Sequence, residues 1–266
     1  MRRNMKLHVE SRGQGPDLVL LHGWAMHGGM WGPWLDGLVG GARLHVVDLP
    51  GHGRSPWVAE ACDLAGLAEA VVPVVPQGAT VLGWSLGGMV ALELGRRYPR
   101  HLRALVLVAT TPRFLAAPGW NHGLEPAVLD GFTHGLEADC HQTVQNFLTL
   151  QARGDERAAA TLRALRSLIA ARAEPDRRAL AAGLDVLRSV DLRTTLPQIE
   201  LPALVVSGEH DCLMPAEAGK ALAAALPCAR LRIIERSGHA PFLSHPDHVL
   251  AEVRGFLSRQ AQGEVA

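Results

Sequence analysis

Short runs of apolar residues, separated by Gly, Pro and polar residues, recur along most of the chain. Runs of this length that are rich in Val and Leu predict buried β-strands. They cover residues 17–21, 44–49, 80–82, 104–108, 203–207 and 231–234. Longer segments with helical spacing follow several of these runs. This alternation predicts an α/β protein with a mostly parallel sheet flanked by helices.

Two helices are well defined by the spacing of their apolar positions. Apolar residues recur at helical spacing between residues 86 and 97, and Pro99 ends this helix because proline cannot continue it. Near the end of the chain, five apolar residues at i, i+1, i+4, i+7 and i+8 form one stripe, which we expect to be buried: Val249, Leu250, Val253, Phe256 and Leu257.

The middle of the chain breaks the alternation of strands and helices. Residues 111–190 contain no β-branched run and are dominated by Ala, Leu, Arg, Glu and Gln, which predicts a helical insertion. It separates the strand at 104–108 from the strand at 203–207. We therefore expect a core formed by residues 1–110 and 191–266, with residues 111–190 as a helical lid over the strand ends.

Composition and charge exclude several classes of protein. In the 266 residues, 48% are apolar and 20% charged, as in ordinary globular proteins. Lys plus Arg and Asp plus Glu are 26 each, so the net charge is zero. A neutral chain has no overall attraction for nucleic acid or for an anionic membrane, and neither is expected as a partner.

Cysteine usage and the N-terminal residues indicate the compartment. The four cysteines form no C-x-x-C pair, so neither a disulfide framework nor a metal site is predicted, and no cofactor is expected. The polar first 15 residues precede a short apolar run that is too short for a signal peptide or a membrane span. We expect a cytoplasmic protein and, because no apolar heptad demands a partner helix, a monomer.

Residues 83–87 have the sequence G-W-S-L-G and lie between a predicted strand and a predicted helix. A serine on such a tight turn has a strained backbone, and side chains two positions away on either side would collide. Gly83 and Gly87 therefore fit the turn that presents Ser85 as a nucleophile.

A serine nucleophile needs a histidine base and a carboxylate that orients the base. His239 follows the strand at 231–234, and Asp211 follows the strand at 203–207, so both lie at carboxyl ends of strands, where catalytic groups gather. The chain order Ser, Asp, His is that of α/β-hydrolases. Glu209 is the alternative acid. Three other histidines are interpreted as solvated or structural: His210, His245 and His248.

Two glycine-containing turns follow predicted strands. After the strand at 17–21, a backbone N–H near Trp24 and the N–H of Leu86 would form an oxyanion hole. Residues 48–55 form the second turn, which we interpret as structural rather than catalytic.

Several stretches together identify a family. They are LLHGW at 20–24, VDLPG at 47–51, LGWSLGG at 82–88, FLTLQ at 147–151, Gly183 with Leu184, VDLR at 190–193, HAPF at 239–242 and SHP at 244–246. They resemble the α/β-hydrolase superfamily. From residue 6 to residue 257 the chain is similar to the carboxylesterases that act on pimeloyl-acyl-carrier-protein methyl ester in biotin synthesis.

The resemblance implies an α/β-hydrolase fold with a lid and a catalytic triad of Ser85, Asp211 and His239. It implies hydrolysis of the methyl ester of a carrier-bound pimeloyl chain to the free pimeloyl carrier and methanol, with activity on short esters as well. An acyl-carrier protein is then the partner. The implied substrate-binding residues are Trp24, Ser85, Leu86, Phe147, Leu148, Thr149, Leu150, Gln151 and His239.

A carrier protein is acidic, so the resemblance implies arginines on the lid. Residues 153–178 contain seven arginines and four acidic residues, a net charge of +3. However, Gln142 and Asn146 stand where relatives carry arginine. The carrier contacts are therefore predicted at Arg153, Arg157, Arg163 and Arg166. The alternative is a solvated helix face in a chain with only two lysines, where arginine supplies almost every basic residue.

Two other functions fit the same residues. A different lidded hydrolase, either a general short-chain esterase or a C–C bond hydrolase, would use the same triad, because specificity depends on pocket contacts that a sequence does not locate. A non-catalytic ligand receptor on this fold would keep the three residues without turnover.

Overall fold

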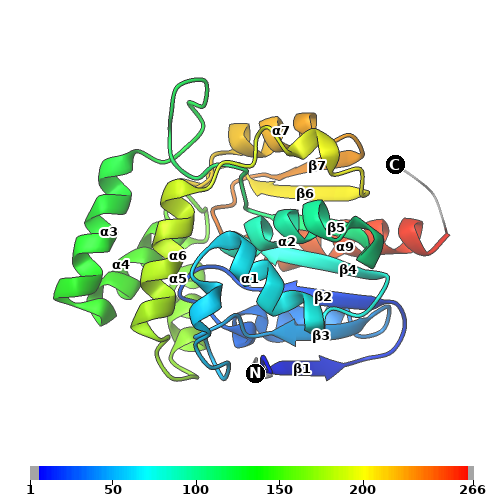
Figure 1. Cartoon of the computed structure of the whole chain (residues 1–266), viewed down its shortest axis with the longest axis horizontal. Coiled ribbons are helices and arrows are strands. Elements are labelled where there is room, and N and C mark those ends of the chain that lie inside the picture. Colours follow the sequence, from blue (N-terminus) through cyan, green and yellow to red (C-terminus); the bar gives the residue numbers. More distant parts are fainter. Residues whose placement is uncertain (1–5, 263–266) are drawn as a thin grey trace.

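The computed structural model describes residues 6–262, so the first five and last four residues of the predicted core lie outside the described residues. Seven strands form one sheet in the order β1-β3-β2-β4-β5-β6-β7 (Figure 1). All neighbouring strands are parallel except β1 and β3. The strands are β1 (Val9–Arg12), β2 (Asp17–Leu21), β3 (Arg43–Val47), β4 (Ala79–Trp84), β5 (Leu102–Val108), β6 (Ala203–Gly208) and β7 (Ala229–Ile234).

The predicted parallel sheet is confirmed, with differences at its edge and at strand ends. β1 was not predicted, because it is an edge strand in which only Val9 is partly buried. β3 ends at Val47, two residues before the predicted end, since Asp48 begins a turn. β4 runs from Ala79 to Trp84 and is longer than predicted. All of its residues are buried in the centre of the sheet.

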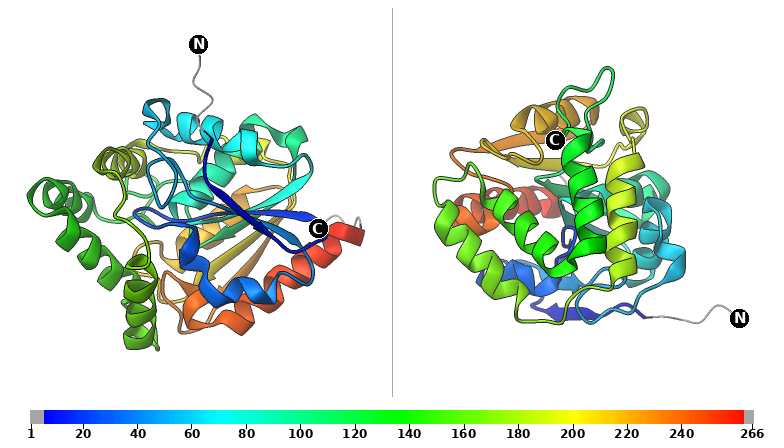
Figure 2. Two further views of the ribbon diagram at one scale, coloured as in Figure 1. Left: turned by 90° about the horizontal axis from the view of Figure 1, so that it is seen from below. Right: turned by 90° about the vertical axis from the view of Figure 1, so that its left-hand side faces the viewer.

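Helices cover both faces of this sheet. One face carries α1 (Leu64–Val71) and α2 (Leu86–Arg97), and the other carries η1 (Gly28–Gly37) and α9 (Pro246–Gln262), as the left view of Figure 2 shows. α7 (Ala216–Ala225) packs against β6 and β7, and α8 (Pro241–Ser244) precedes α9. Four further 3₁₀ turns connect these elements: η2 (Ala59–Ala61), η3 (Val72–Val74), η4 (Pro99–His101) and η5 (Leu196–Gln198).

Both predicted helices are confirmed. α2 begins at Leu86 and ends at Arg97, as the apolar spacing predicted. In α9, Val249, Val253 and Phe256 are fully buried, and the other two residues of the stripe pack against the same core. Within residues 6–262 no helix is long and apolar enough to cross a bilayer.

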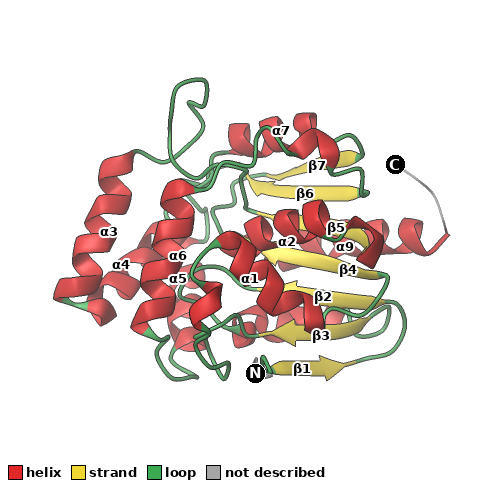
Figure 3. Cartoon of the chain, viewed as in Figure 1, coloured by secondary structure: helices red, strands yellow, loops and turns green. Residues whose placement is uncertain are grey.

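Four helices between β5 and β6 stand together beyond the carboxyl ends of the parallel strands (Figures 1 and 3). They are α3 (Pro126–Ala138), α4 (Cys140–Ala152), α5 (Ala158–Ile169) and α6 (Arg177–Ser189), and we refer to them as the lid helices. α4 packs against α3 and α5, and α6 packs against α3. Any catalytic group at the strand ends therefore lies between the sheet and these helices.

A buried ion pair fastens the lid helices to the core. Arg172, which follows α5, donates to Asp48 at 2.7 Å and to Glu10 at 2.9 Å. The Asp48 side chain is 1% exposed and also accepts from the backbone N–H groups of Gly28 and Arg54. A buried carboxylate is costly without such partners, so the Arg172 guanidinium offsets the cost of burying Asp48.

We expect Arg172→Met to lower the free energy of unfolding by about 3 kcal/mol, because it leaves a buried charge without its cation while keeping an apolar side chain. Urea unfolding measures the difference. Arg166→Met is the matched control, since Arg166 is exposed and forms no ion pair within residues 6–262. Equal stability of the two variants would contradict the role of the pair.

Candidate active site

Ser85 occupies the sharp turn between β4 and α2. Its backbone has φ +57° and ψ −120°, a strained conformation for a residue with a side chain. The turn also brings chain segments very close together. A Cβ at Gly83 would collide with the carbonyl of Gly87, and a Cβ at Gly87 would collide with the carbonyl of Leu21. Both positions therefore require glycine, as the G-x-S-x-G spacing predicted.

The end of the neighbouring strand β5 holds Ser85 in this conformation. Its N–H donates to the carbonyl of Val108 at 3.0 Å, and its carbonyl accepts from the hydroxyl of Thr110 at 2.8 Å. Because both backbone groups are bonded to the end of β5, the strain is opposed by packing and hydrogen bonds. The serine is 4% exposed and lies at the end of the central strand.

Asp211 and His239 meet at the ends of β6 and β7. Asp211 Oδ2 lies 2.7 Å from His239 Nδ1, and both side chains are almost completely buried. Asp211 Oδ1 accepts from the N–H groups of Leu213 and Met214. Since a carboxylate only accepts, Nδ1 carries the proton and Nε2 is the basic nitrogen. The alternative acid, Glu209, is exposed and instead accepts from the N–H of Arg236.

The indole of Trp84 connects this pair to the serine turn. Trp84 directly precedes Ser85, and its Nε1 donates to the backbone carbonyl of His239 at 2.8 Å. The Nε2 atom of His239 is buried and has no hydrogen-bond partner among residues 6–262, Ser85 included. Such contacts between nucleophile and base are often long in structures without substrate. The free Nε2 is available to take a proton.

A second turn lies beside Ser85. A Cβ at Gly23 would lie 3.1 Å from the Cβ of Ser85, so this turn approaches Ser85 directly. In the described part of the chain, the backbone N–H groups of Trp24 and Leu86 donate no hydrogen bond. Two unpaired donors next to a serine can stabilise the anion of a tetrahedral intermediate.

His22 fixes the position of that turn. Its Nε2 accepts from the N–H of Leu49 at 2.9 Å, so Nδ1 carries the proton and donates to the carbonyl of Gly23 at 2.9 Å. Burial lowers the pKa of His22 well below 6.5, and the nearby His52 lowers it further. The imidazole is therefore neutral, which its acceptor role at Leu49 requires.

Comparisons with known proteins agree with this geometry. A family model described as the alpha/beta hydrolase family matches residues 18–253. A pimeloyl-acyl-carrier-protein methyl ester esterase from Aeromonas hydrophila subsp. hydrophila is 43% identical over 254 residues, which are 95% of this chain and 100% of the relative. A protein of the same name from Aeromonas salmonicida is 45% identical over 255 residues, with coverage of 95% and 100%. This chain belongs to that esterase family.

The fold of this esterase is shared with solved structures. An esterase from Exiguobacterium antarcticum superimposes with a TM-score of 0.85 at 24% identity, over 95% of both chains. At that identity the likeness establishes the α/β-hydrolase fold alone. Both the fold and the family predicted from the motifs are thus confirmed.

Trp24 lies fully buried between the core and the lid helices of the esterase. Its indole N–H donates to the carbonyl of Leu180 in α6 at 2.9 Å. The ring of Phe147 in α4 packs edge-on against the indole, with 4.8 Å between the ring centroids. Gly183 allows this approach, because a Cβ there would lie 2.5 Å from Trp24 and 3.5 Å from Leu86. Three of the predicted substrate-binding residues are therefore brought together around the second turn.

The other predicted lid residues divide between two sides of α4. Leu148 and Gln151 are buried, and both polar atoms of the Gln151 carboxamide lack a hydrogen-bond partner among residues 6–262. Thr149 is exposed and donates to the carbonyl of Gln145. Together with the half-buried Leu150 it borders an open groove of about 490 Å³ that also contains Phe132 and Leu162.

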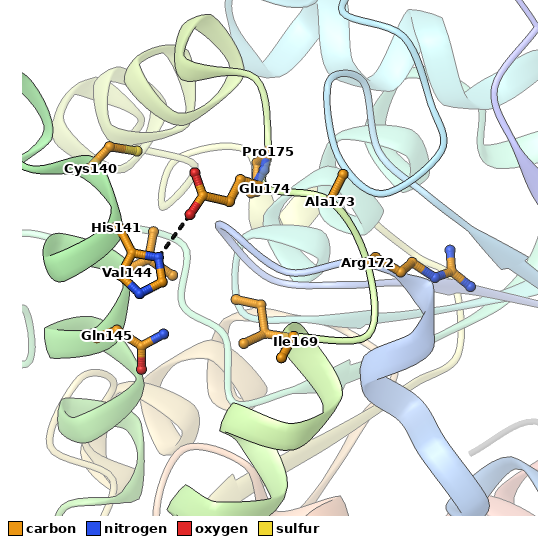
Figure 4. Close-up of a pocket in the computed structure, with 10 residues that line it drawn as sticks. Cys140, His141, Val144, Gln145, Ile169, Arg172, Ala173, Glu174 and Pro175 are labelled. Carbon is orange, nitrogen blue, oxygen red and sulfur yellow. Dashed lines mark hydrogen bonds and ion pairs between the residues drawn. The ribbon is translucent and has the colours of Figure 1, made fainter.

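A separate pocket of about 170 Å³ lies between α4 and the segment that joins α5 to α6. Its walls are mostly apolar and include Val144 and Ile169, and the pair formed by His141 and Glu174 lies across it at 2.8 Å (Figure 4). Arg172 borders this pocket, but its guanidinium points away from the other labelled side chains. None of the predicted substrate-binding residues lines this pocket.

The lid arginines differ in their surroundings. Arg163 and Arg166 are exposed on α5 and form no ion pair in the part of the chain that the structure describes, and the same is true of Arg153. Arg157 is also exposed, but it donates to the carbonyl of Ser244 at 2.7 Å. Another arginine of residues 153–178, Arg172, points inward and pairs with Asp48.

Several residues that hold the site have no motif of their own. Sequence reasoning missed the indole of Trp84 as a support for His239, and it missed Asp155, which accepts from the N–H of Gly238. The position of Trp84 inside the G-x-S-x-G motif could have indicated the first role. Nothing local marks Asp155, because its partner lies 83 residues away in the sequence.

The neutral histidines beside the serine turn predict a loss of stability in acid. Burial lowers the pKa of His52 to about 4, whereas an unfolded histidine titrates near 6.5. Between these values the unfolded state binds the extra proton, so the contribution of His52 is complete above pH 6.5 and is lost as the pH falls toward 4. As the pH falls over this range, we expect the free energy of unfolding, measured with urea, to decrease by about 3 kcal/mol more in the wild type than in His52→Gln. Parallel pH curves for the two proteins would contradict the assignment.

Proposed function

We propose that this esterase hydrolyses the methyl ester of pimeloyl-acyl-carrier protein, giving the free pimeloyl carrier and methanol for biotin synthesis. The observation that carries the proposal is the 43–45% identity, over 95% of the chain, to esterases of that name. The arrangement of Ser85, Asp211 and His239 supports the reaction type, since such a triad performs acyl transfer without a cofactor.

In the first step, His239 Nε2 takes the proton of Ser85 as the hydroxyl oxygen attacks the ester carbonyl. The N–H groups of Trp24 and Leu86 stabilise the oxyanion, and Asp211 keeps Nδ1 protonated and stabilises the imidazolium. The intermediate collapses when His239 returns the proton to the departing methoxy group. Methanol leaves, and the acyl group remains on Ser85.

In the second step, water replaces methanol and His239 acts as the base again. The hydroxide adds to the acyl carbonyl, the same N–H groups hold the second oxyanion, and Ser85 leaves with the proton from His239. The product is a carboxylate at the end of the carrier-bound chain.

Residues 111–190 act as a lid domain in this proposal. Phe147, whose ring contacts Trp24, and the buried Leu148 would line the methylene chain, and Gln151 and Leu150 would border it. The carrier would dock on the exposed arginines outside: Arg153, Arg157, Arg163 and Arg166. Binding energy from the carrier would then position the ester at the serine.

Ser85→Ala tests the nucleophile. We expect turnover of p-nitrophenyl butyrate and of the carrier-bound ester to fall by roughly 10⁴ to 10⁶, because the triad acts as a unit. Ser167→Ala, at an exposed serine of α5, is the control and keeps full activity. A Ser85→Ala protein with near-wild-type rates would falsify the triad.

The substrate is tested by rescue of a biotin-requiring strain that lacks its own methyl esterase. Rescue by the wild type and none by Ser85→Ala is the expected result. If the protein hydrolyses p-nitrophenyl esters but never rescues growth, a different lidded hydrolase is favoured. If it turns over neither substrate, the non-catalytic receptor is favoured.

Charge reversal tests the docking surface. The double variant Arg163→Glu, Arg166→Glu is expected to raise KM for the carrier-bound ester about tenfold and to leave p-nitrophenyl butyrate hydrolysis unchanged. The control variant Arg43→Glu, Arg230→Glu makes the same charge change at the N-terminal ends of β3 and β7, which are the strand ends away from the lid helices. An equal effect of the two double variants would contradict a specific docking face.

A further inference from the structure

The segment between α4 and α5 contacts the loop that carries His239. The N–H of His239 donates to the backbone carbonyl of Gln151 at 3.2 Å. The N–H of the preceding residue, Gly238, donates to Asp155 Oδ2 at 3.0 Å. Two consecutive amides of the histidine loop are therefore bound by the chain that leaves α4, and one of the two acceptors is a side chain.

Asp155 is buried, with 6% of its surface exposed. Its Oδ1 accepts from the N–H of Arg157 at 2.7 Å, and no Lys, Arg or His side chain pairs with it within residues 6–262. Backbone amides thus supply all the hydrogen bonds that this carboxylate receives there. The two oxygens of one side chain therefore join the N–H of Arg157 to the N–H of Gly238 in the histidine loop.

The groups around His239 come equally from the core and from the lid segment. The core supplies Asp211 at the ring and Trp84 at the backbone carbonyl. The lid segment supplies Gln151 at the N–H of His239 and Asp155 at the N–H before it. We propose that Asp155 is a positioning residue, which fixes the His239 loop so that Nε2 faces the serine.

Close packing leaves this loop little room. A Cβ at Gly238 would lie 3.1 Å from the carbonyl oxygen of Gln151 and 3.3 Å from the Cβ of Asp155. Further along, the N–H of Glu156 donates to the carbonyl of Arg236 at 2.9 Å. Without the Asp155 bond, the loop gains freedom next to the base. A displacement of about 1 Å at a catalytic group can cost roughly a hundredfold in rate.

The inference rests on the proposed function, because His239 is the base only if the triad operates. It adds that the lid helices take part in catalysis through the backbone of α4 and the carboxylate of Asp155. A lid that only covered the substrate would not need a buried carboxylate bonded to the histidine loop.

Two substitutions separate positioning from folding. Asp155→Ser keeps an oxygen near the N–H of Arg157, but its shorter side chain does not reach Gly238. We expect kcat for p-nitrophenyl butyrate to fall about tenfold or more while KM changes less than twofold. Asp155→Asn has the same shape and keeps an oxygen for Gly238, while its NH2 group replaces the acceptor of the Arg157 N–H. Because the bond to the histidine loop remains, we expect kcat within about threefold of the wild type.

Asp139→Ser is the matched control. Asp139 is another aspartate of the lid, which caps α4 through the N–H of Gln142 at 2.9 Å and has no hydrogen bond to the histidine loop in the described chain. Thermal unfolding of every variant verifies that it is folded. We expect this control to have wild-type kcat.

Proton NMR gives a readout that activity alone does not. The proton between His239 Nδ1 and Asp211 should produce a far-downfield signal in the wild type, Asp155→Asn and Asp139→Ser, and a shifted or broadened one in Asp155→Ser. A folded Asp155→Ser with wild-type kcat overturns the proposal. So does a loss of kcat without any change in this signal.

The same assays separate this inference from the proposed function. If Ser85→Ala is inactive while Asp155→Ser keeps full activity, the positioning role fails and the triad stands. If Ser85→Ala remains active, the proposed function fails, and the role of Asp155 fails with it.

Discussion

The close approach of β2, β4 and α2 at Ser85 is the constraint on which the site depends. The turn forces a positive φ on a residue with a side chain, and it leaves no space for a Cβ at Gly83 or Gly87. The strain is held by bonds to the end of β5, so the serine has its place only within the completed sheet. Trp84, which precedes it, then donates to the His239 carbonyl, so the same turn is also bonded to the loop of the proposed base.

Buried polar side chains at the strand ends are held in place by hydrogen bonds and an ion pair to other loops. His22 must be neutral to accept from Leu49, and burial keeps it neutral. Asp48 is almost fully buried and accepts from two backbone amides and from Arg172. Each group is costly to bury alone, and each has a partner from a different loop. The loops around the serine are therefore held relative to one another by a few directed bonds.

Local patterns were sufficient to predict the parallel strands, α2 and α9, and they also indicated the candidate triad, because each of these follows from residues adjacent in sequence. Ser85, Asp211 and His239 all lie in the loops that follow β4, β6 and β7, so their shared location follows from parallel topology. Edge strand β1 gave no such signal, since its residues are mostly exposed. Arg172 and Asp155 gave none either, because their partners lie 124 and 83 residues away.

Arg172 also shows why the net charge of a segment differs from the charge of its surface. Residues 153–178 carry a sequence charge of +3, but Arg172 is paired with a buried carboxylate of the core and Arg178 with Asp176. Arg157 is partly occupied by the Ser244 carbonyl. An acidic partner would meet the arginines that have no internal acceptor, and Arg163 and Arg166 share one exposed helix. The inward arginine contributes instead to holding that helix against the core, so one residue type performs both tasks in the lid.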